Sequence, residues 1–411
     1  MRIFIFLIFF LVIQYVYADH YTPYSSLSYV DRPCGTDLSN LWLDVVLVVD
    51  NSEEMGSQRL FDVAANIIDV FGANTRIGSN SSEPITTRVG LITYNFNATL
   101  NANLSQFQSY DDLSNGVFHS LSNVTNSTDS FIGTGLAMAE QLLRRQNFNT
   151  TRDHYKKVII VYASAFQRNE DETPEWIADR LKGSGVKIIT VGYGNSHGLI
   201  KSLSNIASPG LSFNSSGDGN LINQIQTSLL QGKFQCNYIF YISISANCYC
   251  PSTWIQYTSS YSNSSSYHYG LCIQPVPTLT TWRMAHYACI FLGNHSSLAT
   301  EYNQDKHDFL LDAVKDTSGF SPPYQYHIGL MSNSYYWGWD PPTGSSGPTL
   351  QSWSNWILGF QGDTEARSVI NIESENLKEG TTGWLNIDDT RTKAGYVCES
   401  YACDTDNYCH S

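Results

Sequence analysis

The sequence predicts two folded modules: an α/β domain built on a doubly wound parallel sheet, followed by a smaller α+β domain that contains disulfides. Up to Leu230, short apolar runs alternate with segments of helical periodicity, which is typical of a parallel sheet with helices on both faces. From Cys236 onward this periodicity fades and Cys, Trp, Tyr and Gly become frequent, which indicates a loop-rich domain with aromatic anchors. The length of 411 residues fits this division, because it exceeds that of one ordinary domain.

The first strand is the clearest element of the α/β domain. Val45–Val49 contain no polar residue, as in a parallel strand that is buried on both faces. Asp50 ends this run, and an Asn51-Ser52 turn leads into an amphipathic helix. Because α/β folds place ligand sites at the carboxyl ends of their strands, we expect Asp50 and Ser52 at the rim of such a site.

The remaining elements follow in order. Strands are expected at Leu43–Val49, Arg88–Tyr94, Val158–Tyr162 and Val186–Val191. Helices are expected at Leu60–Phe71, Gly135–Leu143, Trp176–Leu181 and Ile222–Leu230. In the second module, the pattern predicts helices at Trp282–Leu292 and Asp308–Val314.

Residues 1–18 have the pattern of a signal peptide. Arg2 supplies a positive charge, Ile3–Ile13 form an apolar core, and Val16-Tyr17-Ala18 form a small-residue cleavage site. The apolar run is shorter than the roughly 20 residues that a membrane-spanning helix needs, and no later segment is long and apolar enough. We therefore predict a secreted, extracellular protein without membrane insertion.

Charge, cysteines and sequons restrict the function classes further. The net charge of −14 and the scarcity of Lys and Arg argue against binding to nucleic acids or anionic membranes. Nine cysteines predict disulfides, and the odd number leaves one thiol that is free or joins two chains in a disulfide-linked oligomer. Asn-x-Ser/Thr sequons predict glycosylation at Asn80, Asn97, Asn103, Asn123, Asn126, Asn149, Asn214, Asn263 and Asn294. Their density between Asn80 and Asn149 predicts one heavily glycosylated face.

Five sequence blocks of the first module resemble the von Willebrand factor type A family, over residues 41–232. The blocks are Asp44–Ser52, Arg88–Tyr94, Gly133–Leu136, Lys157–Val161 and Ile189–Gly194. The resemblance implies a Rossmann-like fold. It also implies a divalent cation at an Asp-x-Ser-x-Ser turn, with a Thr from a second loop and an Asp from a third.

On this resemblance, the cation site consists of Asp50, Ser52 and Thr134. Glu54 stands where the second Ser is expected, and Ser164 is nearest to the position of the third-loop Asp. Glu54 adds a bulky negative charge where the family has Ser, and Ser164 removes the negative charge where the family has Asp. We therefore predict a degenerate, inactive site. No resident cofactor is then expected, with bound Ca²⁺ or Mg²⁺ as the alternative.

The second module resembles a C-type lectin-like domain over residues 250–400, after a linker at 233–249 and before a Cys-containing tail at 401–411. His327–Leu330 and Trp337–Asp340 carry the resemblance, together with the cysteine spacing. It implies the disulfides Cys250–Cys272 and Cys289–Cys398. The inner disulfide of the family is absent, because Ser368 stands at one of its positions.

Residues 19–40 are expected to form a polar lead-in that contains Cys34. Cys34 and Cys236 flank the first module, whose two termini should lie close together, so a Cys34–Cys236 disulfide is predicted. The pairing of Cys248, Cys403 and Cys409 is left open by the sequence.

Sugar-binding C-type lectins hold calcium with Glu-Pro-Asn or Gln-Pro-Asp and then Trp-Asn-Asp. The nearest residues here are Gln361, Asp363, Asn386 and Asp388. Gly362 replaces the Pro, so a cis peptide that aims the oxygens is not expected. We therefore predict a degenerate carbohydrate and calcium site, whose polar residues are solvated loop side chains.

Catalytic patterns are weak. Gly194-Asn195-Ser196-His197-Gly198 imitates a hydrolase nucleophile turn, but no His between His197 and His268 can complete a triad. We predict a non-enzymatic recognition or adhesion protein that binds extracellular carbohydrates or proteins, by analogy in innate immune defence. The alternative is a structural extracellular-matrix component in which both metal sites are inactive.

Overall fold

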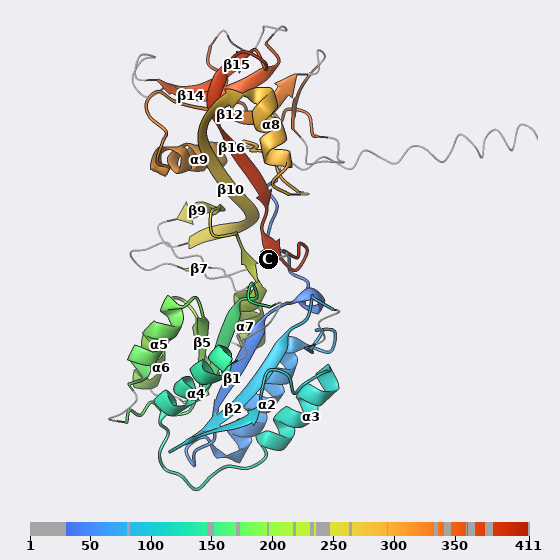
Figure 1. The fold of residues 1–411 in the computed structure, drawn as a ribbon. Helices are drawn as coiled ribbons and strands as arrows, with labels where there is room; N and C mark the ends of the chain where they lie inside the picture. The colour runs from blue at the N-terminus through green and yellow to red at the C-terminus, as the bar shows by residue number, and fades with distance from the viewer. Residues whose placement is uncertain are drawn as a thin grey trace, which may run out of the picture.

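A computed structural model describes residues 30–409, apart from gaps at 80–82, 146–151, 170–172, 195–196, 217–218, 231–233, 236–246, 263–264, 294, 333–335, 341–346, 359, 361–365 and 375–380. Two modules are stacked end to end, the first at the bottom of Figure 1 and the second at the top. The fold class is the predicted one: a parallel α/β sheet with helices on both faces, followed by an α+β module with disulfides.

The sheet of the first module has the strand order β3-β2-β1-β4-β5-β6. Its strands are β1 (Asp44–Asp50), β2 (Arg88–Tyr94), β3 (Ala98–Ala102), β4 (Lys157–Ala163), β5 (Lys187–Gly192) and β6 (Ser212–Asn214). β1 pairs in parallel with β2 and β4, whereas β3 is antiparallel to β2. Every residue of β1 is buried, in agreement with its apolar run.

Helices cover both faces of this sheet. One face carries α2 (Gly56–Phe71), α3 (Tyr110–Ser120) and α7 (Leu221–Leu230), and the other carries α4 (Ile132–Arg145), α5 (Pro174–Gly183) and α6 (His197–Ile206). A short 3₁₀ turn, η1 (Leu38–Asn40), precedes β1. Gly135 lets α4 lie close to the sheet, because a Cβ there would come within 2.7 Å of Val48 Cγ1.

In the part of the chain that the structure describes, no helix combines the length and the apolar character that crossing a membrane requires.

The second module is built on a sheet with the order β15-β14-β12-β16-β10-β7, to which β9, β11 and β13 are attached. The strands are β7 (Phe234–Gln235), β8 (Cys248–Tyr249), β9 (Ile255–Ser262), β10 (Ser265–Thr281), β11 (Ser297–Leu298), β12 (Tyr324–Ser332), β13 (Trp337–Trp339), β14 (Ser368–Ser374), β15 (Thr381–Ile387), β16 (Lys393–Tyr401) and β17 (Cys403–Asp404). The helices are α8 (Trp282–Ile290) and α9 (Gln304–Asp316). Its core is aromatic: the buried Trp384 ring lies nearly perpendicular to those of Trp339, Trp353 and Trp356.

The described part of the lead-in packs against the second module. The Gly270 N–H donates to the Arg32 carbonyl over 2.7 Å, and the Arg32 guanidinium donates to the Gly270 carbonyl over 3.0 Å. Asp31 lies 2.6 Å from Lys306 Nζ of α9. The chain therefore runs from the second module down to β1 and returns after α7, so that β10 and β16 stand beside the lead-in (Figure 1).

An aromatic cluster joins the two modules, and we call it the joint. Trp42, which precedes β1, is fully buried, and its indole N–H donates to the Asp404 carbonyl over 2.9 Å. The rings of Tyr155, Tyr249 and Tyr408 lie 5.3, 5.8 and 4.9 Å from the Trp42 ring. Because Tyr155 belongs to the first module and the others to the second module and the tail, the joint holds both modules in one arrangement.

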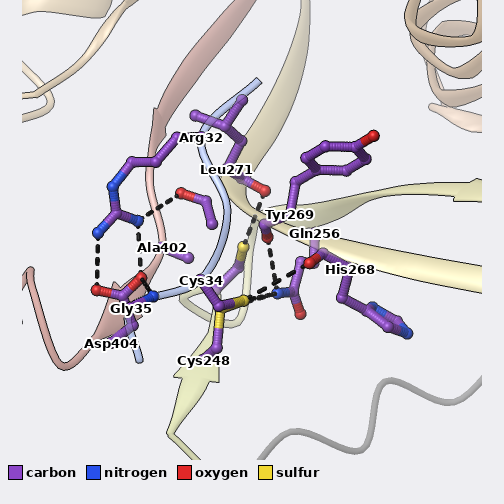
Figure 2. The surroundings of a disulfide bond; sticks show 12 residues. Arg32, Cys34, Gly35, Cys248, Gln256, His268, Tyr269, Leu271, Ala402 and Asp404 are labelled. Atoms are coloured by element: carbon purple, nitrogen blue, oxygen red, sulfur yellow. Dashed lines mark hydrogen bonds and ion pairs between the residues drawn. A yellow bond between two sulfur atoms is a disulfide. The ribbon is translucent and has the colours of Figure 1, made fainter. Parts of the chain in front are cut away.

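A disulfide and an ion pair lie near Asp404, whose carbonyl accepts the bond from Trp42 of the joint, and Figure 2 shows their surroundings. The Arg32 guanidinium donates to both carboxylate oxygens of Asp404, over 2.7 and 2.8 Å. The Gly35 N–H donates to the same carboxylate over 2.9 Å. Cys34, between these two residues of the lead-in, is bonded to Cys248.

This pairing corrects the predicted Cys34–Cys236 disulfide. The prediction placed Cys34 at the edge of the first module, but Pro33 forms a β-bridge with Tyr269 and so holds Cys34 at the root of the second module. The Cα atoms of Cys34 and Cys248 are 5.8 Å apart, a normal distance for a disulfide. Cys236 lies outside the described residues.

Three further disulfides are present. Cys250 is bonded to Cys272 and Cys289 to Cys398, which are the two pairs that the resemblance implied. Cys403 is bonded to Cys409 and closes a small loop in the tail. Of the nine cysteines in the sequence, Cys236 alone belongs to none of the four bridges.

Candidate functional site

Asp50 lies at the carboxyl end of β1 and is fully buried. Its Oδ1 accepts the Ser52 N–H over 2.9 Å. Its Oδ2 accepts three bonds: from the Ser130 hydroxyl over 2.9 Å, from the Ser164 N–H over 3.1 Å and from the Ser164 hydroxyl over 2.6 Å. Residues of three loops therefore converge on one carboxylate, as α/β topology predicts for this edge.

Thr134 does not take the predicted place in this site. Its hydroxyl donates to the Phe131 carbonyl over 2.7 Å, within the first turn of α4. The hydroxyl of the second loop comes instead from Ser130, which is buried and lies just before α4. The helix begins earlier than the predicted Gly135, so Thr134 is already part of the helix and the preceding loop supplies the side chain.

Sequence reasoning missed Ser130. It stands in a segment rich in Ser, Asn and Thr, where no spacing distinguishes one hydroxyl from the next. The nearest usable signal is its position directly before the apolar residues that open the helix, Phe131 and Ile132.

Von Willebrand factor type A domains can hold a metal at this position, where the turn offers Asp50 as its buried acid. Mg²⁺ is bound in proteins through one or two carboxylates together with waters, and Ca²⁺ takes about six to eight oxygen ligands. Asp50 already accepts bonds from the chain itself on both oxygens, and Glu54 is exposed. The buried Ser52 hydroxyl, without a hydrogen-bond partner in the described part of the chain, is the one feature that favours a ligand.

The rim of the site is held by hydrogen bonds between loops. The Asn95 side-chain amide donates to Asn51 Oδ1 over 2.9 Å and to Thr125 Oγ1 over 3.2 Å. The N–H and the hydroxyl of Thr125 both donate to the Asn51 carbonyl over 2.9 Å. The residue after Asp50 is therefore clamped between the loop after β2 and the segment before α4.

Two of the four residues expected to bind calcium and sugar can be placed. Gln361 and Asp363 lie outside the described residues. Asn386 lies within β15, and the Asp388 carboxylate accepts the Thr390 hydroxyl over 2.7 Å and the Thr390 N–H over 2.8 Å. These bonds lower the pKa of Asp388. Asp388 therefore stabilises a turn after β15.

A buried polar network inside the aromatic core has no counterpart in the sequence reasoning. Glu301 is fully buried and accepts the Trp384 indole N–H over 2.7 Å. His307 Nδ1 lies 2.8 Å from the same carboxylate. Burial alone would lower the pKa of His307, but the charge and hydrogen bond of Glu301 raise it above its ordinary value. Trp384 thus anchors the core of the second module.

The family model of the von Willebrand factor type A domain matches residues 44–228. A Caenorhabditis elegans protein, C-type lectin domain-containing protein 160, is 26% identical over 409 residues. This match covers 94% of this chain and 57% of the relative, so the chain spans little more than half the length of that relative.

Solved structures with similarity include proximal thread matrix protein 1 from the mussel byssus, at 23% identity and a TM-score of 0.37 over 47% of this chain and 46% of that chain. A second is the C-type lectin CEL-I from Cucumaria echinata, at 20% identity and a TM-score of 0.27 over 36% of this chain and 96% of that chain.

The first module is a von Willebrand factor type A domain. The chain as a whole is a two-module protein in which this domain is followed by a C-type lectin-like module.

Proposed function

We propose that this chain is a secreted, non-enzymatic recognition protein that binds extracellular carbohydrates or proteins, and that its type A domain works without a metal. The proposal that the domain works without a metal rests on one observation: the Asp50 carboxylate accepts four hydrogen bonds from the chain itself. The four disulfides support an oxidising, extracellular setting. A role in innate immune defence rests on analogy with other proteins of this architecture.

The joint supports a recognition role for the chain as one unit. Trp42 and the Cys34–Cys248 disulfide hold the modules end to end, so a ligand of one module meets a fixed surface of the other. A rigid pair loses less conformational freedom on binding than two modules on a flexible linker, and this favours affinity for extended ligands.

A glycan array with the full chain, in calcium and in EDTA, tests the carbohydrate part. We expect any sugar binding to survive EDTA, because the residues described at both sites are engaged in hydrogen bonds of the chain. Asp363→Ala is the critical variant, and Asp308→Ala, an exposed residue of α9, is its matched control. Binding that requires calcium and is lost only in Asp363→Ala would show an active calcium site and contradict the metal-free proposal for the lectin-like module.

The alternative function is that of a structural matrix component. It is favoured by one observation: eight cysteines pair with one another in four bridges, and Cys236 is left over. Electrophoresis without and with reducing agent tests it. A reducible dimer that disappears in Cys236→Ser supports a crosslinked component, and a monomer under both conditions excludes crosslinking through this residue.

A further inference from the structure

Three exposed sequons stand on the rim of the Asp50 site. Asn97 follows β2, and Asn123 and Asn126 lie in the segment between α3 and α4. We infer that Asn97, Asn123 and Asn126 carry N-linked glycans which together cover the carboxyl edge of the first module and shield it from protein partners. This inference rests on the proposed secretion of the chain, because the modification occurs in the secretory pathway.

The hydrogen bonds of the rim bring the first two sequons together. Asn95 and Thr125 are both bonded to Asn51, the residue that follows Asp50. Asn97 stands two residues after Asn95, and Asn123 stands two residues before Thr125. Each of the two sequons therefore begins two residues from a member of the same clamp, although they are far apart in the sequence.

The third sequon borders the turn itself. The Glu53 N–H donates to the Ser127 carbonyl over 2.8 Å, and Asn126 directly precedes Ser127. The surface between the sequons is one that a partner could otherwise contact: the Phe96 side chain is 56% exposed, with its ring 5.7 Å from that of Phe131. Glu53 adds an exposed charge to this surface.

The side chains of the three rim asparagines are exposed. In the described part of the chain, no hydrogen bond engages the side-chain amides of Asn97, Asn123 or Asn126. A glycan on each of the three rim residues therefore displaces no contact of the fold.

Shielding follows from the size of the modification. An N-linked glycan is bulky and strongly hydrated, so three of them at one edge exclude a protein surface from the area between them. Glycans over this edge are compatible with an Asp50 carboxylate that is bonded within the chain, because such a site needs no carboxylate from a partner. Partners of the first module then bind to its helical sides.

Site mapping tests the modification. The full chain is expressed in secreting eukaryotic cells, recovered from the medium and treated with peptide N-glycosidase in ¹⁸O water, and each labelled Asn is read by mass spectrometry. We expect label at Asn97, Asn123 and Asn126. A secreted chain without label at these residues overturns the inference and leaves the proposed function standing, whereas a chain retained in the cells contradicts the proposed secretion itself.

Hydroxyl-radical footprinting of Phe96 tests the shielding. The triple variant Thr99→Ala, Asn123→Gln, Thr128→Ala removes the three sequons and leaves the hydrogen bonds of the clamp in place. Ser105→Ala is the matched control, because it removes the sequon at the far end of β3. We expect the oxidation rate of Phe96 to rise several-fold in the triple variant and to stay unchanged in the control.

Enzymatic removal of the glycans from the folded wild-type chain gives the same comparison without any substitution. We expect the same several-fold rise at Phe96. Equal oxidation rates with and without glycans would overturn the shielding.

Discussion

Replacing Asp50 by Asn tests whether this carboxylate stabilises the fold or serves a cation. Asn keeps the size of the side chain and one carbonyl oxygen, but it places an NH₂ group where Oδ2 accepts three hydrogen bonds. The hydroxyls of Ser130 and Ser164 can rotate and accept from that group, whereas the backbone N–H of Ser164 cannot. At least one buried donor then loses its acceptor.

The magnitude follows from these bonds. A hydrogen bond to a charged acceptor contributes about 1.5–3 kcal/mol, and a buried donor without a partner costs about 1–3 kcal/mol. We therefore expect Asp50→Asn to lower the free energy of unfolding of the first module by about 2–4 kcal/mol in EDTA. If Asp50 were instead an unsatisfied metal ligand, its removal would relieve a buried charge and would not destabilise the domain.

Calorimetry of the full chain, in EDTA and in excess MgCl₂, measures both effects. Glu54→Gln is the control, because the Glu54 side chain is exposed and its loss should change stability by no more than about 0.5 kcal/mol. A cation present at 100 times its Kd would stabilise the wild-type domain by about 2.7 kcal/mol. A rise of this size with Mg²⁺, together with an Asp50→Asn variant that is no less stable in EDTA, would refute the reasoning.

Three further predictions concern the second module and the joint. The pKa of His307 is raised by Glu301, so the stability that this contact contributes is complete below pH 6.5, the ordinary pKa of His. This stability is lost as the pH rises through the raised pKa. The urea midpoint should therefore fall between pH 5 and 9 in the wild type, and should fall less in His307→Gln. Lys306→Met leaves Asp31 buried without its 2.6 Å partner and should cost about 3–5 kcal/mol, measured by urea unfolding. Trp42→Ala should cost about 3–5 kcal/mol in the same assay and should speed proteolysis between the modules.

Controls for these variants come from the surface. Lys315→Met removes a half-exposed ion pair with Glu373 and should cost no more than about 1 kcal/mol. Trp176→Ala removes a side chain that is 69% exposed and should change stability by no more than about 0.5 kcal/mol. If a buried variant costs no more than its surface control, the proposed packing at that position is wrong. A His307→Gln profile as steep as that of the wild type would assign the pH dependence to another group.

Much of the first module could be predicted because its signals are local. Five consecutive apolar residues before Asp50 fit a buried parallel strand, and β1 is found there with every residue buried. Ser130 could not be predicted, since its role arises only when a loop 80 residues away in the sequence folds over the end of β1. One hydroxyl in a polar segment carries no local signal of such a contact.

The joint was beyond sequence reasoning for the same physical reason. The position of Cys34 depends on the isolated β-bridge between Pro33 and Tyr269, and no pattern in the lead-in predicts this contact. The assumption that the residues flanking a domain pair with each other was reasonable, but here the lead-in is held by the other module. Trp42 likewise stands as a single aromatic residue next to an apolar strand, and its partners come from distant parts of the chain.

The two departures at the Asp50 turn make sense together. An acid at position 164 would place a second carboxylate beside Asp50, and the repulsion between the two charges would require a cation to offset it. Ser164 instead provides an N–H and a hydroxyl, and with Ser130 these direct positive partial charges at Asp50 without any metal. Once the chain itself compensates Asp50, the edge above it no longer has to admit a carboxylate from a partner. Exposed sequons on that rim would hinder an open metal site, but they are compatible with a closed one.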